Sequence, residues 1–229
     1  MKIIRDLESA KSLLLGHSVA ESAEALPVVK QRIREIFDED ITPEEAVRRI
    51  LAQVRTGGDH ALIDLGRKID GMGLAQLEIT KGEIAESYKK VDKNLVGSLQ
   101  LASERIHTFH QIQKKKLGLD FVDKGLGFIV NALERVGIYI PGGRAYYPST
   151  VLMTAIPAKV AKVNRCALFT PPNREGRVPD AILAAAYLVE VDEVYKIGGA
   201  QAVAAMAYGT QTIKKVEKIV GPGNVYVTT

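Results

Sequence analysis

The stretch VGIYIPGGRAYYPSTVLM, residues 136–153, decides how the second half of this sequence folds. Its opening residues, Val136–Ile140, are rich in β-branched side chains and favour a strand. The pair Gly142–Gly143 then permits a tight turn, because glycine tolerates positive φ angles. Pro148–Thr150 supplies a helix start, with a proline for the first turn and hydroxyls for capping. A strand that feeds a helix through glycines leaves backbone N–H groups free at one point, where an anion can bind.

The same strand-to-helix pattern recurs along the rest of the sequence. Further strands are expected at Cys166–Phe169, Glu193–Ile197 and Lys218–Val220, with helices at Ser149–Val163, Pro179–Val189 and Gln201–Tyr208. Strands that alternate with helices of this length predict a parallel sheet with helices on its faces. Pro157 is expected to bend or loosen the first of these helices.

The last residues, Asn224–Thr229, read as a helix start without a terminating glycine, proline or basic cap. A parallel sheet of this small size with an incomplete last helix would leave an apolar face uncovered. We therefore expect the sequence to be a piece of a longer chain or to need a partner segment.

Residues 1–134 are predicted to be mainly helical. Apolar spacing and capping signals place helices at Ser22–Phe37, from Thr42 to Gly57–Gly58, from Asp59 (as a cap) to Ile69, from Thr80 onward and from Asp92 to Lys116. A short strand is expected at Leu77–Ile79, and Asp123–Gly125 is typical of a hairpin turn. The predicted fold class is therefore α/β. A helical amino-terminal region with a small hairpin, residues 1–134, precedes an incomplete Rossmann-like parallel-sheet domain, residues 135–229.

The composition argues against several classes of protein. With 46% hydrophobic and 25% charged residues, the sequence is that of a globular protein able to bury a core. Its net charge is +4, and its tightest basic cluster, Lys114–Lys116, falls where a helix dipole favours cations. No nucleic-acid partner is therefore predicted. The first residues lack a long apolar run and predict neither a signal peptide nor a membrane span. The single cysteine, Cys166, rules out an internal disulfide and fits a cytoplasmic location.

Glycine-bearing turns follow three of the predicted strands, at Pro141–Gly143, Gly198–Gly199 and Gly221–Gly223. In a parallel sheet these turns meet at one edge, where α/β proteins bind ligands. The glycines indicate either a closely approaching ligand or simply short loops, and we favour the ligand. The polar side chains beside the turns, able to stack, pair with phosphate or hydrogen-bond a ribose, are Tyr139, Arg144, Gln201 and Asn224.

Two features of a standard dinucleotide site are missing. No GxGxxG motif is present, and Thr170–Pro172 stands after the second strand of the sheet, where an acid would hold a ribose hydroxyl. Spacing alone therefore argues against the standard mode of dinucleotide binding.

The remaining reactive residues give weaker signals. His107 and His110 stand one helical turn apart, but no cluster of further ligands completes a metal site, so a surface or half-buried role is favoured. His17 and His60 are isolated and are interpreted as structural. Cys166 is expected to be a small buried residue rather than a nucleophile. No histidine–carboxylate pair stands at the glycine edge, so a general base is not visible.

Several long motifs closely resemble the histidinol dehydrogenase family. They are VGIYIPGGRAYYPSTVLMTAIPAKVAKV, TPP, VDEVYKIGGAQAVAAMAYGT and KVEKIVGPGNVYVT, with GGDHAL and ERIHTFHQIQ nearer the amino terminus. The similarity runs from near the N-terminus to Thr229. Members of this family are considerably longer, so the resemblance covers their amino-terminal half.

The resemblance implies an NAD-dependent enzyme of histidine biosynthesis that oxidises L-histidinol to L-histidine through histidinal. Such enzymes hold their substrate with zinc and form homodimers. The family's NAD contacts match Tyr139, Gln201 and Asn224 of this sequence. The zinc ligands, the catalytic Glu–His pair and most substrate contacts would follow Thr229, so no catalytic or metal-binding residue is assigned here. The 229-residue chain alone is therefore expected to be inactive.

Two hypotheses follow from these observations. The first is the amino-terminal half of a histidinol dehydrogenase that is truncated, cleaved or split, which predicts a further segment that carries the zinc ligands. The second is a non-catalytic nucleotide-binding or regulatory domain that works within a complex. Both place a nucleotide at Tyr139, Gln201 and Asn224.

Overall fold

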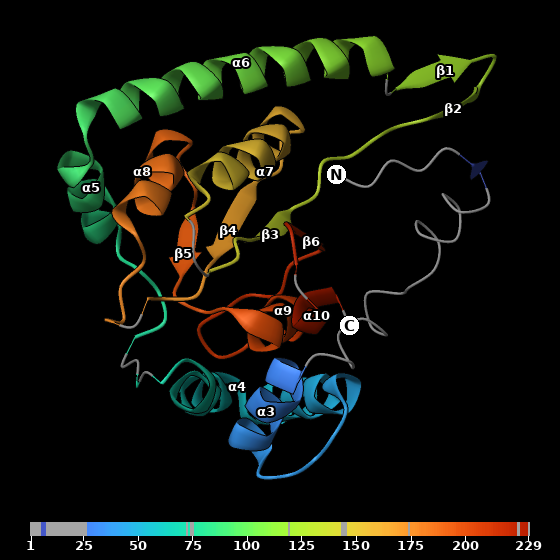
Figure 1. The fold of residues 1–229 in the computed structure, drawn as a ribbon. Helices are drawn as coiled ribbons and strands as arrows, with labels where there is room; N and C mark the ends of the chain where they lie inside the picture. Colours follow the sequence, from blue (N-terminus) through green and yellow to red (C-terminus); the bar gives the residue numbers. More distant parts are fainter. Residues whose placement is uncertain are drawn as a thin grey trace.

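The structure is a computed structural model of the chain (Figure 1) and describes residues 6–7, 27–71, 73, 76–118, 120–142, 146–173, 175–223 and 225–228. Its helices are α3 (Pro27–Phe37), α4 (Pro43–Asp70), α5 (Lys81–Lys90), α6 (Lys93–Leu117), α7 (Pro148–Val160), α8 (Asp180–Leu188), α9 (Gly199–Tyr208) and α10 (Val225–Thr228). Its strands are β1 (Phe121–Asp123), β2 (Leu126–Phe128), β3 (Arg135–Tyr139), β4 (Arg165–Phe169), β5 (Glu193–Tyr195) and β6 (Lys218–Val220). None of the helices in these ranges is both long and apolar enough to cross a membrane.

Four parallel strands form the central sheet in the order β5-β4-β3-β6. The chain winds outward from β3 through β4 to β5 and then returns to place β6 on the other side of β3. This is the strand order of the first part of a Rossmann sheet. Ile138 of β3 lies opposite Leu168 of β4 and Val220 of β6, which fixes the register. The predicted α/β fold with an incomplete Rossmann-like sheet is confirmed, and its winding reverses between β3 and β6.

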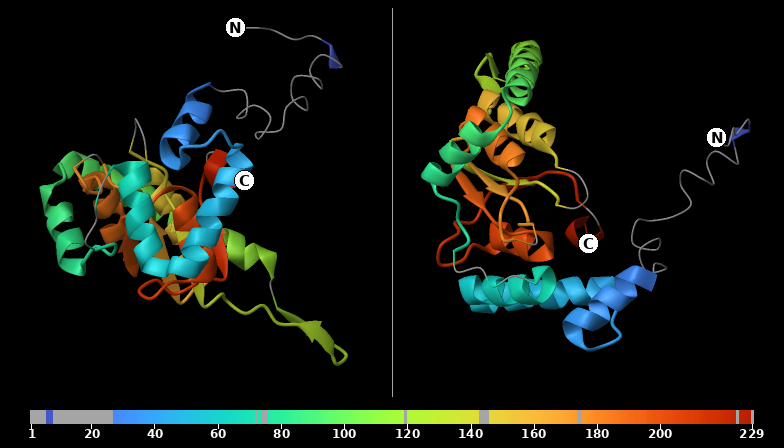
Figure 2. Two further views of the ribbon diagram at one scale, coloured as in Figure 1. Left: turned by 90° about the horizontal axis from the view of Figure 1, so that it is seen from below. Right: turned by 60° about the vertical axis from the view of Figure 1, so that its left-hand side comes forward.

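Different helices cover the two faces of the sheet (Figures 1 and 2). Ile138 and Leu168 point into a core shared with α7 and α8, and the outer helices α5 and α6 pack over these two. Tyr139 and Phe169 point the opposite way, into a core shared with α9 and α4. The helical amino-terminal region therefore supplies an outer layer on both sides of the sheet, and α4 reaches the loops at its carboxyl edge.

The sequence predicted that one helix ends at Gly57–Gly58 and another follows, and the structure confirms this break inside α4. The helix is broken only at Gly58, whose φ of 54° and ψ of −133° are not helical. The prediction that Asp59 caps the following helix is wrong, because its backbone N–H and its carboxylate bond to a loop that is distant in the sequence. The N–H of Asp59 donates to Oε1 of Gln211 at 2.8 Å, and its carboxylate accepts from the hydroxyl of Thr210. A Cβ on Gly58 would collide with Gln211, so this junction requires glycine.

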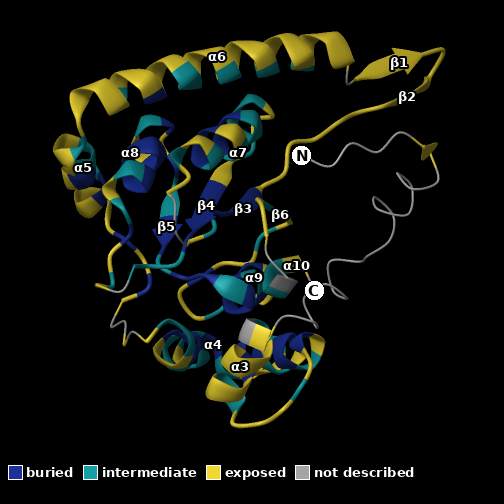
Figure 3. Cartoon of the chain, in the orientation of Figure 1, coloured by how far each residue is buried: buried dark blue, intermediate teal, exposed yellow. Residues whose placement is uncertain are grey.

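Helix α6 and the hairpin after it match their predictions. The Asp92 carboxylate accepts from the first N–H groups of α6, and Gly118 ends the helix with a φ of 52°. The turn at Lys124–Gly125 has positive φ at both residues, as two-residue hairpin turns require. The β1–β2 hairpin projects from the body and all six of its strand residues are exposed (Figures 1 and 3).

Other local expectations were less accurate. The N-cap of α7 is Tyr147, which makes no side-chain capping bond, so the hydroxyls of Ser149–Thr150 lie within the helix rather than before it. Pro157 lies inside α7, and the expected bend or loosened turn there stays a prediction. The strand expected at Leu77–Ile79 is reduced to an isolated antiparallel bridge between Glu78 and Tyr195 of β5. Capping and edge pairing depend on neighbouring elements, which local sequence does not specify.

Candidate functional site

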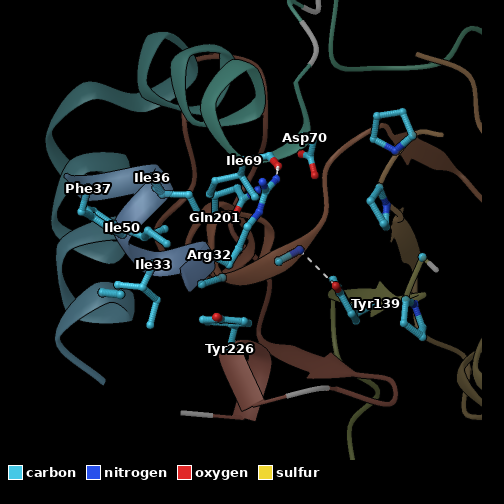
Figure 4. Close-up of a pocket in the computed structure, with 17 residues that line it drawn as sticks. Arg32, Ile33, Ile36, Phe37, Ile50, Ile69, Asp70, Tyr139, Gln201 and Tyr226 are labelled. Carbon is cyan, nitrogen blue, oxygen red and sulfur yellow. Dashed lines mark hydrogen bonds between the residues drawn. The ribbon is translucent and has the colours of Figure 1, made fainter. Parts of the chain in front are cut away.

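A pocket of about 360 Å³ opens at the carboxyl ends of the strands (Figure 4). One wall comes from the loops after β3 and β4 and from the first residues of α9, and the other comes from α3 and α4. The apolar side chains of the second wall are Ile33, Ile36, Phe37, Ile50 and Ile69. The pocket lies where the winding of the sheet reverses, which is where open α/β sheets bind ligands.

Tyr139 ends β3 at the pocket. The residue is only 3% exposed, and its hydroxyl oxygen accepts a hydrogen bond from the N–H of Gly199 at 3.0 Å (Figure 4). Burial raises the pKa of this hydroxyl above its ordinary value, and the Gly199 N–H only partly offsets that effect. The phenol therefore keeps its proton at neutral pH and can donate it to an acceptor on a ligand.

Gln201 lies in the first turn of α9 and also lines the pocket. The residue is 1% exposed, and its Oε1 oxygen has no hydrogen-bond partner among the residues that the structure describes. Leaving a buried polar atom without a partner costs about 1–3 kcal/mol. A ligand with a hydroxyl or amide donor would remove this cost. The unbonded oxygen of Gln201 therefore indicates a binding site.

The pocket thus brings together two of the predicted contacts, Tyr139 and Gln201, from β3 and α9. The third, Asn224, lies outside the described residues, as do Gly143 and Arg144 of the first glycine turn. The structure therefore does not test their placement.

The glycine turns do converge at this edge, but close packing between loops explains three of the glycines. A Cβ on Gly142 would lie 2.4 Å from Cγ of Pro171, and one on Gly198 would lie 2.4 Å from Cβ of the same proline. Gly221 has a φ of 142°, and a Cβ there would lie 2.1 Å from the carbonyl oxygen of Tyr139. Packing between the loops therefore accounts for glycine at these positions, and contact with a ligand stays a prediction. Their small size lets Pro171 form part of the pocket wall.

Two charged residues from the helical region face the same pocket. Burial raises the pKa of the Asp70 carboxyl to about 6, and the nearby positive charge of Arg32 only partly opposes this. Arg32 donates to the carbonyl oxygen of Ile69 and, at 3.0 Å, to Oε2 of Glu35 (Figure 4). Arg32 thereby ties α3 to the end of α4 and closes one side of the pocket.

The other candidates lie away from this pocket. His107 and His110 are on α6, where His110 Nδ1 lies 2.8 Å from Oε1 of Gln113. No group of three or more histidine, cysteine or acidic side chains able to hold a metal occurs within the described ranges. Cys166 is 1% exposed, and burial raises the pKa of its thiol to about 11, so it packs as a small apolar residue. His17 lies outside the described residues.

Comparison with known proteins agrees with this geometry. The family model described as histidinol dehydrogenase matches residues 34–229, which include the sheet and most of the residues that line the pocket. This chain belongs to the histidinol dehydrogenase family. Histidinol dehydrogenase from Archaeoglobus fulgidus is 48% identical over 186 residues, which are 80% of this chain and 46% of that protein. The enzyme from Syntrophotalea carbinolica is 51% identical over 190 residues, which are 81% and 44% of the two chains.

A solved structure supports the same membership of the histidinol dehydrogenase family. The crystal structure of histidinol dehydrogenase from Elizabethkingia anophelis matches with a TM-score of 0.71 and 34% identity, over 87% of this chain and 46% of that one. The chain thus spans a little under half the length of the relatives that it matches.

Sequence reasoning missed the helical wall of the pocket. Arg32, Ile33 and Asp70 belong to helices that precede the sheet, and nothing in their local pattern distinguishes them from other residues on amphipathic helices. Asp70 carries one weak signal, because an acid at the last position of a helix is unfavourable. Only the packing of α4 across the sheet edge brings these side chains to the site.

Proposed function

We propose that this chain forms the NAD-binding part of a histidinol dehydrogenase, which oxidises L-histidinol to L-histidine through histidinal in the cytoplasm. Membership of the family supports the reaction. The observation that carries the cofactor assignment is the buried, unbonded Oε1 of Gln201, which lies beside Tyr139 in a pocket at the sheet edge.

The described residues suit NAD in three ways. The apolar and proline-lined walls fit a flat base, the Gln201 oxygen accepts from a hydroxyl or amide, and the Tyr139 hydroxyl donates to an oxygen. Asn224 is proposed as the third contact. NAD supplies the hydride acceptor when it is bound, and these side chains fix its orientation and exclude water.

The test is calorimetric titration of the 229-residue chain with NAD. Gln201→Leu removes the amide and keeps much of its volume, so NAD affinity should fall about tenfold, the loss expected when one buried hydrogen bond is removed. Gln113→Leu, an exposed glutamine on α6, is the matched control and should bind like wild type. Failure of the wild-type chain to bind NAD, or equal binding by Gln201→Leu, would contradict the assignment.

We further propose that this chain alone does not turn over histidinol. The described histidines, His60 on α4 and His107 and His110 on α6, do not line the pocket, so the described residues place no imidazole base near the cofactor contacts. Incubation with L-histidinol and NAD should give no NADH absorbance. Steady NADH formation by the purified chain would show that a base is present after all.

Two remaining features of the proposal come from family membership alone, a zinc ion that holds the substrate and a homodimeric assembly. The proposed division of the chain into residues 1–134 and 135–229 rests on the change of sequence pattern at this point. The described residues offer no cluster of zinc ligands, so no step is assigned to zinc here. Analytical ultracentrifugation tests the dimer, which would sediment at twice the chain mass.

A further inference from the structure

The acid that is missing after the second strand of the sheet is supplied by another element. In Rossmann sheets an acid at the end of the second strand holds the ribose hydroxyls of NAD. Here that strand is β4, which leads into Thr170–Pro172. Pro171 and Pro172 nevertheless share the pocket with Asp70, the last residue of α4 (Figure 4). Among the described residues that line this pocket, Asp70 is the only acid.

The position of Asp70 makes its side of the pocket unfavourable for a second anion. The carboxyl stands at the carboxyl end of α4, where the helix dipole is negative. The guanidinium of Arg32 is close, but it already donates to the carbonyl of Ile69 and to the carboxylate of Glu35. Within the described part of the chain, the other titratable groups that line the pocket are the phenols of Tyr139 and Tyr226. This side therefore favours neutral hydrogen-bond donors.

We propose that Asp70 selects the cofactor by accepting hydrogen bonds from the free hydroxyls of its adenosine ribose and repelling a ribose 2′-phosphate. The pocket then takes NAD and rejects NADP. This inference rests on the proposed function of the pocket, and it adds a specificity residue that comes from the helical region rather than from the sheet. Rossmann sites select their cofactor in the same way. A carboxylate there binds the ribose hydroxyls of NAD, and a cation accommodates the 2′-phosphate of NADP.

The experiment compares NAD and NADP binding by calorimetry for the wild-type chain, Asp70→Asn and Asp64→Asn. The wild type should prefer NAD by about tenfold or more, because facing like charges are strongly unfavourable. Asp70→Asn should reduce this preference at least fivefold, mainly through tighter NADP binding. Asp64→Asn changes an acid on the same helix that does not line the pocket, and it should keep the wild-type ratio.

The outcomes separate this inference from the proposed function. If the wild type binds neither nucleotide, the NAD pocket itself is refuted and the role of Asp70 falls with it. If NAD binds and Asp70→Asn leaves the NAD-to-NADP ratio unchanged, only the selection by Asp70 is overturned. Circular dichroism checks folding, and Asp70→Ser provides a second uncharged variant if Asp70→Asn does not fold.

Discussion

The carboxyl of Asp70 should destabilise the folded chain at neutral pH. Burial raises its pKa from 3.8 to about 6, and each pKa unit corresponds to about 1.4 kcal/mol. A shift of about two units gives about 3 kcal/mol, which we reduce to about 2 kcal/mol because the side chain keeps some contact with solvent. Asp70→Asn removes the charge at nearly constant shape. The variant should therefore be about 2 kcal/mol more stable than wild type at pH 8.

The raised pKa of Asp70 also determines how the stability of the folded chain changes with pH. Between the unfolded pKa of 3.8 and the folded pKa of about 6, the folded chain holds more protons at Asp70 than the unfolded chain. The contribution of Asp70 to wild-type stability therefore falls as pH rises through this window and is constant above it. Asn does not titrate, so the advantage of Asp70→Asn should be small near pH 4 and should reach its full size by about pH 7.

Urea denaturation followed by circular dichroism, repeated from about pH 4 to about pH 8, measures this difference directly. Asp64→Asn, on the same helix but about half exposed, should change stability by less than about 0.5 kcal/mol across the range. An advantage of Asp70→Asn that does not vary with pH, or a loss of stability at pH 8, would refute the reasoning. A loss would show that the carboxylate is well paired in the fold.

Two further predictions concern close packing at the site and buried charge at the opposite edge of the sheet. Gly198→Ala places a Cβ 2.4 Å from the ring of the proline in the neighbouring loop and should cost about 2 kcal/mol in urea denaturation. Gly97→Ala, in open space on α6, should instead stabilise by about 0.5–1 kcal/mol; equal effects would contradict the packing argument. Arg135→Met leaves the Glu193 carboxylate without its buried guanidinium and should cost about 3 kcal/mol. Arg165→Met breaks an exposed ion pair and should cost less than about 1 kcal/mol, so a similar loss for both arginines would refute the role of burial.

The central part of the fold was predictable because local chemistry and tertiary structure agree there. Each of the four parallel strands overlaps the range expected for it, and α6 begins directly after the predicted cap residue Asp92. Each of these elements is specified by its own residues, through strand propensity, capping or a glycine that permits a positive φ angle. Errors arose where the deciding group came from elsewhere in the chain, as with Gln211 at the break of α4.

The site likewise contains residues that the sequence could predict and residues that it could not. Tyr139 and Gln201 could be selected from the sequence because each follows a recognisable strand, and all parallel strands end at one edge. The sequence could not show that Gly142 and Gly198 pack against Pro171, because a glycine allows a close approach without specifying the neighbouring group.

The sequence by itself therefore indicated the family, the succession of βα units along the chain and the sheet edge at which a ligand should bind. Only the tertiary structure decided what the opposite wall of the pocket contains. Asp70 reaches it because α4 packs across α9 and ends beside the loop after β4. Such a contact depends on how two amphipathic helices pack on one face of the sheet. Helical periodicity shows which face of a helix is buried but does not show which residues pack against it.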